Sequence, residues 1–264
     1  MQDLIILKIG GSVITYKFSK KPKVNFKNLK RISKEIASIY NSLKFPLVLI
    51  HGVGPFGHVI VRKTGIDKGI KNKKQLRYFA ETQRLQNELN VIVTGYLIKA
   101  GLPAIPCQAS SFVVMESGRI IKMDSSAIEG LLKMGMVPVL FGVPAFDRDQ
   151  KCSILSGDQI APFLAAKLNA KRIICATDVD GVFTSDPHKN PNAKLMPRLD
   201  NKNIVQVGKW VTGSTAIDVT GGMLGKVLEL SRIKIESRIL NGLVPGNIVK
   251  VFNGEKIGTI IKLS

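Results

Sequence analysis

The chain has 264 residues, 45% of them hydrophobic, which is enough for one large α/β domain with a sizeable core. Its formal net charge of +20 favours anionic partners, but the lysines are dispersed and few aromatic residues lie among them, so we expect a small phosphorylated molecule and no specific nucleic acid. Three scattered cysteines, no bilayer-spanning apolar run and no signal-peptide pattern argue against a disulfide scaffold and predict a cytoplasmic protein without a membrane partner.

The N-terminal half alternates apolar runs with amphipathic segments. Residues 4–9 are typical of a strand buried on both faces, and they lead into Gly10, Gly11 and Ser12. A helix is expected to begin at Asn25, because apolar residues recur at helical spacing after it. The further elements expected here are a buried strand at 46–50, a basic mobile flap at 65–75, a long helix at 76–100 interrupted near Gly95, and a short strand at 103–107.

The C-terminal half continues this alternation and adds two hairpins, expected at 112–123, turning at Ser117-Gly118, and at 145–154. The remaining elements are helices at 125–134, 156–168 and 221–234, strands at 137–141, 172–176, 237–240 and 257–261, and a short helix after Pro245. Strands that alternate with helices predict right-handed βαβ units and a mostly parallel sheet. A lobe boundary is expected near residues 150–170.

The first strand ends in a pattern that suits a phosphate site. Lys8 is a costly residue at the end of a buried strand unless it meets an anion, and Gly10 and Gly11 let the backbone approach closely. Open α/β sheets bind ligands at the carboxyl ends of their strands. The alternative is a strand end whose lysine extends its ammonium group into solvent.

A glycine-rich segment, GVGPFG at 52–57, follows the second strand and matches the dinucleotide pattern GxGxxG. That fingerprint needs a second strand with an acidic residue roughly 20 residues on, and the segment 67–74 is polar instead. A turn that binds phosphate through backbone N–H groups is therefore favoured over a nicotinamide enzyme. The segment GMLGK at 222–226 resembles the end of a Walker A loop, but Val227 replaces the magnesium-binding Ser or Thr.

Five motifs in chain order resemble the amino acid kinase superfamily, and within it the isopentenyl phosphate kinases of archaeal type. They are LKIGGSVITYK (7–17), HGVGPFGH (51–58), ILSGDQI (154–160), TDVDGVFTSDPHKNP (177–191) and DVTGGMLGK (218–226). The resemblance implies a three-layer α/β/α sandwich with a mostly parallel central sheet, an acceptor-binding lobe at 1–155 and an ATP-binding lobe at 156–264. It also implies phosphorylation of isopentenyl phosphate by ATP, with Mg²⁺ carried on the nucleotide, in a homodimer.

The resemblance assigns roles to the residues that match the family motifs. The implied catalytic residues, which would neutralise or organise phosphoryl charge, are Lys8, Lys17, Asp158 and Lys226. The implied acceptor-binding residues are Gly10, Gly11, Ser12, Gly52, Gly54, His58 and Gly157, with His58 on the acceptor phosphate. The implied ATP-binding residues are Asp178, Asp180, Gly181, Asp186, Gly221 and Gly222. No protein metal ligands are implied, and helix 76–100 is expected to line an apolar pocket for the acceptor's tail.

Five residues depart from the family pattern, mostly on the acceptor side: Tyr16, Val53, Pro55, Val143 and Gln159. Pro55, for example, lacks the N–H group that a serine could donate there. Two alternatives therefore stand beside isopentenyl phosphate. The chain could be a kinase of the same fold that acts on another small phosphate, phosphonate or carboxylate, or a non-catalytic nucleotide- or anion-binding protein.

Overall fold

The computed structural model describes residues 3–187, 189–204, 207 and 222–263. Its centre is an eight-stranded sheet in the order β10-β12-β11-β9-β1-β2-β6-β3. The strands are β1 (Ile5–Ile9), β2 (Leu47–His51), β3 (Ala104–Pro106), β6 (Val137–Phe141), β9 (Arg172–Thr177), β10 (Arg198–Leu199), β11 (Ser237–Asn241) and β12 (Thr259–Ile261). The described neighbours pair in parallel except β11 with β12, which confirms the predicted mostly parallel sheet.

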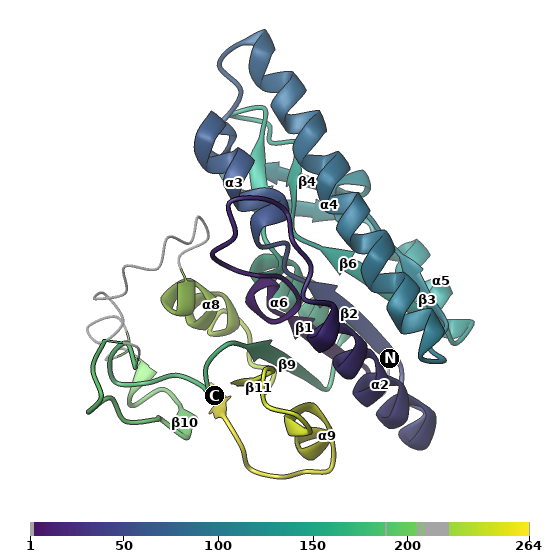
Figure 1. Ribbon diagram of the computed structural model, residues 1–264, viewed down its shortest axis with the longest axis vertical. Coiled ribbons are helices and arrows are strands. Elements are labelled where there is room, and N and C mark those ends of the chain that lie inside the picture. Colours follow the sequence, from purple (N-terminus) through teal and green to yellow (C-terminus); the bar gives the residue numbers. More distant parts are fainter. Residues whose placement is uncertain (1–2, 188, 205–206, 208–221, 264) are drawn as a thin grey trace.

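Helices cover both faces of this sheet, so the fold is a three-layer α/β/α sandwich (Figure 1). On one face α2 (Phe26–Leu43) packs against α4 (Lys73–Lys99) and α9 (Asn247–Phe252). On the other, α6 (Gly157–Leu168) packs against α8 (Gly222–Leu230). The remaining helices are α1 (Gly11–Ile14), α3 (Pro55–Thr64), α5 (Ser126–Lys133) and the short 3₁₀ turns Ile66–Lys68 and Ala109–Ser111.

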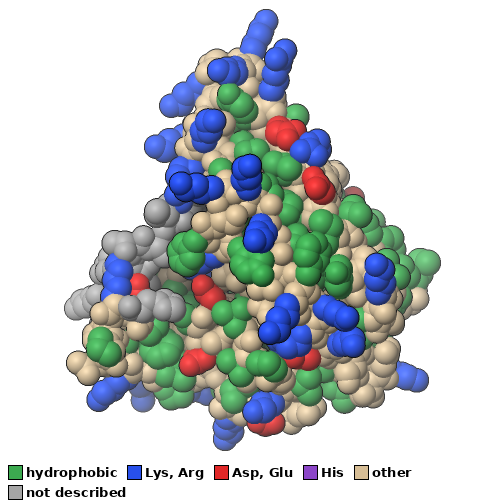
Figure 2. Space-filling model, viewed as in Figure 1, with side chains coloured by type: hydrophobic (Ala, Val, Ile, Leu, Met, Phe, Trp, Pro, Cys, Tyr) green, Lys and Arg blue, Asp and Glu red, His purple; other side chains and the backbone are tan. Residues whose placement is uncertain are grey.

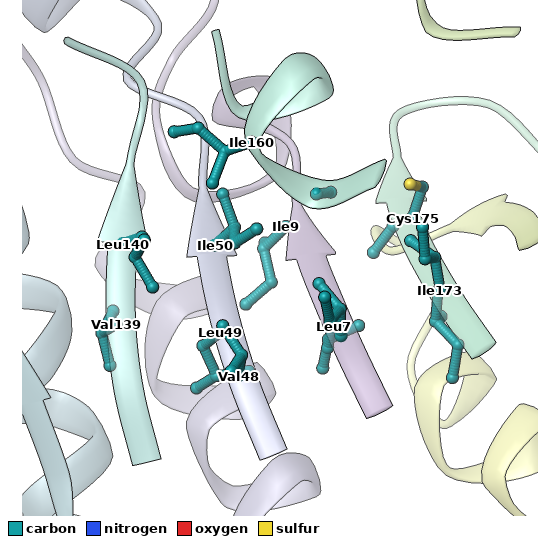
Figure 3. Packing of buried hydrophobic residues seen from close by; sticks show 14 of the residues in the cluster. Leu7, Ile9, Val48, Leu49, Ile50, Val139, Leu140, Ile160, Ile173 and Cys175 are labelled. Carbon is teal, nitrogen blue, oxygen red and sulfur yellow. The ribbon is translucent and has the colours of Figure 1, made fainter. Parts of the chain in front are cut away.

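The middle strands form the floor on which the cavity described below is built. All residues of β1, β2 and β6 are buried, as expected for strands covered on both faces. Leu7 pairs in register with Leu49, and Leu49 with Val139, so their side chains form one layer across three strands. Figure 3 shows this layer and places Ile160 of α6 over Ile50. Full burial of each such side chain stabilises the folded protein by about 1.5–3 kcal/mol, so the ends of these strands have fixed positions.

Two hairpins lie outside the main sheet, and both are as predicted. They are β4 (Val113–Glu116) with β5 (Arg119–Met123), and β7 (Val143–Ala145) with β8 (Ser153–Leu155). The first turns at Ser117 and Gly118, whose φ angles are 46° and 77°. Glycine adopts such angles readily, which explains why the chain reverses at this point.

Three local predictions are wrong. Helix α4 runs without interruption through Gly95, because one glycine costs only about 1 kcal/mol and the flanking turns propagate the helix. Segment 65–75 is anchored instead of free: Ile66 is fully buried, and the N–H of Ile70 donates to the carbonyl of Gln150 at 3.0 Å. Helix α8 ends at Leu230, four residues before the predicted end at position 234.

Basic side chains are spread over the surface. Figure 2 shows Lys and Arg across the visible face, with a concentration at the tip of the molecule where α4 begins. Apolar and acidic side chains interrupt them elsewhere on this face. Among the described helices, none is both long and apolar enough to cross a membrane.

Candidate active site

A cavity of about 720 Å³ opens at the carboxyl ends of β1, β2 and β9. Ligand sites of open α/β sheets form at this edge. The predicted site residues that line it are Lys8, Gly10, Gly11, Ser12, Lys17, Gly52, Gly54, His58, Gly157, Asp158, Asp178, Gly181, Asp186, Gly222 and Lys226. Asp180 does not line it, and its carboxylate accepts a hydrogen bond of 2.9 Å from Nδ2 of Asn241. Gly221 lies outside the described residues.

Two lysines from opposite ends of the sequence meet on one carboxylate. Nζ of Lys8 lies 2.6 Å from Oδ1 of Asp158, and Nζ of Lys226 lies 2.7 Å from the same oxygen. Strand β1 carries Lys8, the first turn of α6 carries Asp158, and α8 carries Lys226. The side chains are only 7%, 13% and 10% exposed, respectively. The structure thus brings three of the four predicted catalytic residues into one ion cluster, which we call the charge triad.

With both lysines protonated, the charge triad has one net positive charge in a nearly buried space. Burial alone would raise the pKa of Asp158, but Lys226 and Lys8 outweigh it and hold that pKa well below its usual value. Burial is the largest influence on both lysines, and it leaves the pKa of Lys8 lowered. At Lys226 the attraction of Asp158, together with hydrogen bonds and Cys175, outweighs burial and leaves the pKa raised. Asp158 is therefore ionised, and the second ammonium group is available to an anion such as a phosphoryl oxygen.

Two glycine turns pack against each other beside the triad. A Cβ on Gly11 would lie 2.6 Å from the backbone N of Gly54, and a Cβ on Gly52 would collide with the backbone N of Gly11. Gly54 also has a φ of 50°, a conformation that favours glycine. The close approach of the two backbones therefore requires glycine at these positions, and it lets both turns line the same cavity.

His51 supports the second glycine turn, although sequence reasoning gives it no role. Its Nδ1 lies 3.0 Å from the carbonyl oxygen of Gly52, and Nδ2 of Asn90 lies 3.0 Å from its Nε2. The carbonyl can only accept and the amide nitrogen can only donate, so these partners assign a neutral ring protonated at Nδ1. Burial lowers the pKa of His51 to about 4. A histidine that ends a buried strand before a glycine turn is the sequence signal that indicates such a support.

Lys17, the remaining one of the four predicted catalytic residues, lies at the cavity mouth and not in the triad. Its Nζ is 3.0 Å from Oδ2 of Asp178, and its side chain is 42% exposed. Burial would raise the pKa of Asp178, but Lys17 and the hydrogen bonds from the backbone and Thr177 together outweigh burial and lower it. The pair joins the loop after α1 to the end of β9, so it connects two walls of the cavity.

The five departures from the family pattern are not all at the cavity. Val53 and Pro55 line it, and Pro55 is the first residue of α3, where a missing N–H group costs no helical hydrogen bond. Tyr16, Val143 and Gln159 are not among the lining residues. Val143 is buried in β7, and Gln159 donates from Nε2 to the carbonyl of Gly118 at 3.0 Å. Three of the five changes are therefore not in direct contact with the cavity.

The expectation that helix 76–100 forms an apolar wall is wrong. Among the described residues of α4, only Gln86 lines the cavity, and the aliphatic lining comes from Val53, Val59, Val61 and Ile154. The physical reason is that the buried apolar residues of α4, Leu89, Val93 and Leu97, pack in the hydrophobic core. The stripe that includes Gln86 is polar, with Thr82, Gln86, Asn90 and Thr94 at helical spacing. Gln86 is 2% exposed, and its buried Oε1 atom has no hydrogen-bond partner.

Comparisons with known proteins give one consistent answer. The model of the amino acid kinase family matches residues 3–241. The isopentenyl phosphate kinases of Methanothermobacter thermautotrophicus and Methanocaldococcus jannaschii are 40% and 37% identical, covering 96% and 99% of this chain and 97% and 99% of the relatives. A crystal structure of isopentenyl phosphate kinase superposes with a TM-score of 0.84 at 39% identity, over 98% of this chain and 100% of the other. The chain therefore belongs to the amino acid kinase family.

Proposed function

We propose that this phosphotransferase moves the γ-phosphoryl group of ATP to isopentenyl phosphate, giving isopentenyl diphosphate and ADP. The observation that carries this proposal is the charge triad, with its net positive charge at the wall of a cavity that also has an aliphatic lining. Full-length similarity to isopentenyl phosphate kinases supports the choice of acceptor. The triad would neutralise the charge of the transferring phosphoryl group, and Val53, Val59 and Val61 would contact the hydrocarbon tail of the acceptor.

Phosphoryl transfer depends mainly on positioning and on neutralising charge. Lys8 and Lys226 would flank the transferring group, and Asp158 would hold both ammonium groups in place. His58 reaches the cavity from the first turns of α3 and would bond the acceptor phosphate. The proton of the acceptor phosphate needs no general base from the chain, because a phosphate oxygen is already ionised near neutral pH.

The nucleotide would occupy the side of the cavity formed by Asp178, Gly181, Asp186 and Gly222. Among the described residues, no three His, Cys, Asp or Glu side chains group closely enough to hold a metal ion. Mg²⁺ would thus be bound chiefly by the ATP phosphates and water, where it offsets negative charge. We also propose the division into an acceptor lobe at 1–155 and an ATP lobe at 156–264, a homodimer and a cytoplasmic location, each from the family resemblance.

A second acceptor class is supported by one observation. Gln86 lies in the wall of the cavity, where a purely hydrocarbon tail would leave its amide oxygen Oε1 without a partner. A small phosphate whose carbon skeleton has a hydroxyl group would supply a donor to that oxygen. The same triad would catalyse either reaction.

Release of ADP, measured with isopentenyl phosphate and with a panel of hydroxylated alkyl phosphates, tests both acceptors. Lys8→Ala should lower turnover by about 10²–10³, the effect of one preorganised charge-stabilising donor. Lys171→Ala, which changes an exposed lysine beyond the cavity, is the matched control. ATP binding without turnover on any acceptor would instead indicate a non-catalytic binding protein, and near-normal turnover of Lys8→Ala would refute the mechanism.

A further inference from the structure

The turn between β4 and β5 contacts both helices that carry the charge triad on the α6–α8 face. The carbonyl of Gly118 accepts a hydrogen bond of 3.0 Å from Nε2 of Gln159, the residue after Asp158 in α6. The next residue, Arg119, extends both terminal guanidinium nitrogens to Glu229 of α8, with Nη2 3.0 Å from Oε2. A single turn is thus connected to the neighbours of both triad partners.

Glu229 lies next to Lys226 on α8, so its position is coupled to that of the lysine. The two residues are three apart in α8, so they lie on neighbouring positions of one helix face. The Glu229 side chain is only 15% exposed, and its two oxygens are paired with the two guanidinium nitrogens. Bidentate pairing of this kind fixes orientation as well as distance. A shift of the Arg119–Glu229 pair would therefore move the backbone that holds Lys226.

The turn can transmit this constraint because a buried carboxylate fixes it from behind. Asp147 is fully buried, and its Oδ2 accepts from the N–H of Gly118 at 2.8 Å and from Oγ of Ser153 at 2.6 Å. Its Oδ1 accepts from the N–H groups of Asp149 and Gln150 at 3.0 and 3.1 Å. Four hydrogen bonds to one carboxylate hold the tip of the first hairpin against the second, so the turn is a rigid support.

Gln159 gains a physical explanation in this arrangement. A carbonyl oxygen such as that of Gly118 requires a donor, and a glutamine amide provides one. An ionised aspartate at this position could only accept. The amide nitrogen of Gln159 therefore suits the turn, whereas its buried Oε1 atom has no hydrogen-bond partner.

We infer that Arg119 and Glu229 act as a clamp that positions Lys226, and that the β4–β5 turn is a supporting element of the phosphoryl-transfer site. Arg119 is a positioning residue, since it lines neither the main cavity nor the triad. The inference rests on the proposed role of Lys226, but it does not depend on which acceptor the enzyme uses.

The test compares Arg119→Met with Arg148→Met. Arg148 provides a matched control, because it pairs with Glu116 of the same hairpin at 3.6 Å on an exposed surface and does not reach α8. Misplacing a catalytic group by about 1 Å can cost up to 10²-fold in rate, so Arg119→Met should lower kcat by about 10- to 100-fold. The KM for the acceptor should stay within about twofold, because the acceptor side is untouched, and Arg148→Met should match the wild type.

A second readout requires no acceptor. Chemical acetylation of Lys226, followed by mass spectrometry with exposed Lys171 as internal reference, reports how firmly the ammonium group is held. Arg119→Met should raise the relative labelling of Lys226 severalfold, even if isopentenyl phosphate is the wrong substrate. A failure of the proposed acceptor and a failure of the clamp are thereby distinguishable.

A variant that exchanges the charges of Arg119 and Glu229 provides a third test. If Arg119→Met is poorly folded, the double variant Arg119→Glu with Glu229→Arg restores an ion pair between the same positions. Recovery of folding, kcat and Lys226 protection to within about threefold of the wild type supports the clamp. Unchanged kcat and labelling in folded Arg119→Met would overturn it, as would an exchange variant that folds normally but keeps Lys226 freely labelled.

Discussion

Replacing Asp158 by asparagine removes the only carboxylate of the charge triad and keeps its shape. Lys8 and Lys226 would then lie side by side, each below about one tenth exposed, without a counter-charge. Breaking a buried ion pair on one side costs about 3–5 kcal/mol, so Asp158→Asn should lower the free energy of unfolding at pH 7 by that amount. Urea titration followed by circular dichroism measures it.

The stability difference between the wild type and Asp158→Asn should depend on pH. The pKa of Asp158 is depressed in the folded protein, so its contribution is present above the unfolded value of 3.8 and is lost as the pH falls below it. The stability gap between wild type and Asp158→Asn should thus be full at pH 7 and shrink in acid. Inorganic phosphate should stabilise the variant more than the wild type, because it replaces the missing charge. Equal urea midpoints at pH 7, or a gap independent of pH and phosphate, would refute this reasoning.

Three further changes probe the surroundings of the triad. Because burial lowers the pKa of His51 to about 4, the folded state resists its protonation, and the wild type loses stability as the pH falls from 6.5 to 4. His51→Gln has no such group, so its free energy of unfolding should fall by up to about 3 kcal/mol less over this range, as measured by urea titration at each pH. Gln86→Leu should raise the thermal midpoint, since an unpaired buried amide oxygen costs about 1–3 kcal/mol, and a lower midpoint would show that this oxygen has a partner. Gly52→Ala should abolish turnover by displacing Gly11, while Gly95→Ala, whose Cβ meets nothing within 4 Å, should leave turnover unchanged in the same assay.

The order of strands and helices could be predicted because apolar runs and turn residues are local signals. The segment around Lys8 shows how far such signals reach: its apolar run predicts a buried strand, and the following glycines predict a close backbone approach. Only a family pattern places Lys226 beside it, since the two residues are far apart in sequence. The polar stripe on the buried side of α4 could not be predicted in this way, because hydrogen bonds such as that of Asn90 to His51 depend on partners far away in the chain.

Packing also determines which lysines of this protein can bind phosphate specifically. Most of the excess lysines are exposed, where solvent and salt weaken their effect, and they can attract anions only as a diffuse field. Lys8 and Lys226 differ because the sheet and two helices force them into a space where one carboxylate cannot neutralise both. Their excess charge is poorly hydrated, so a phosphoryl group that enters gains an interaction that no surface lysine provides. The support of α8 by Arg119 matters for the same reason: the value of that charge depends on its position.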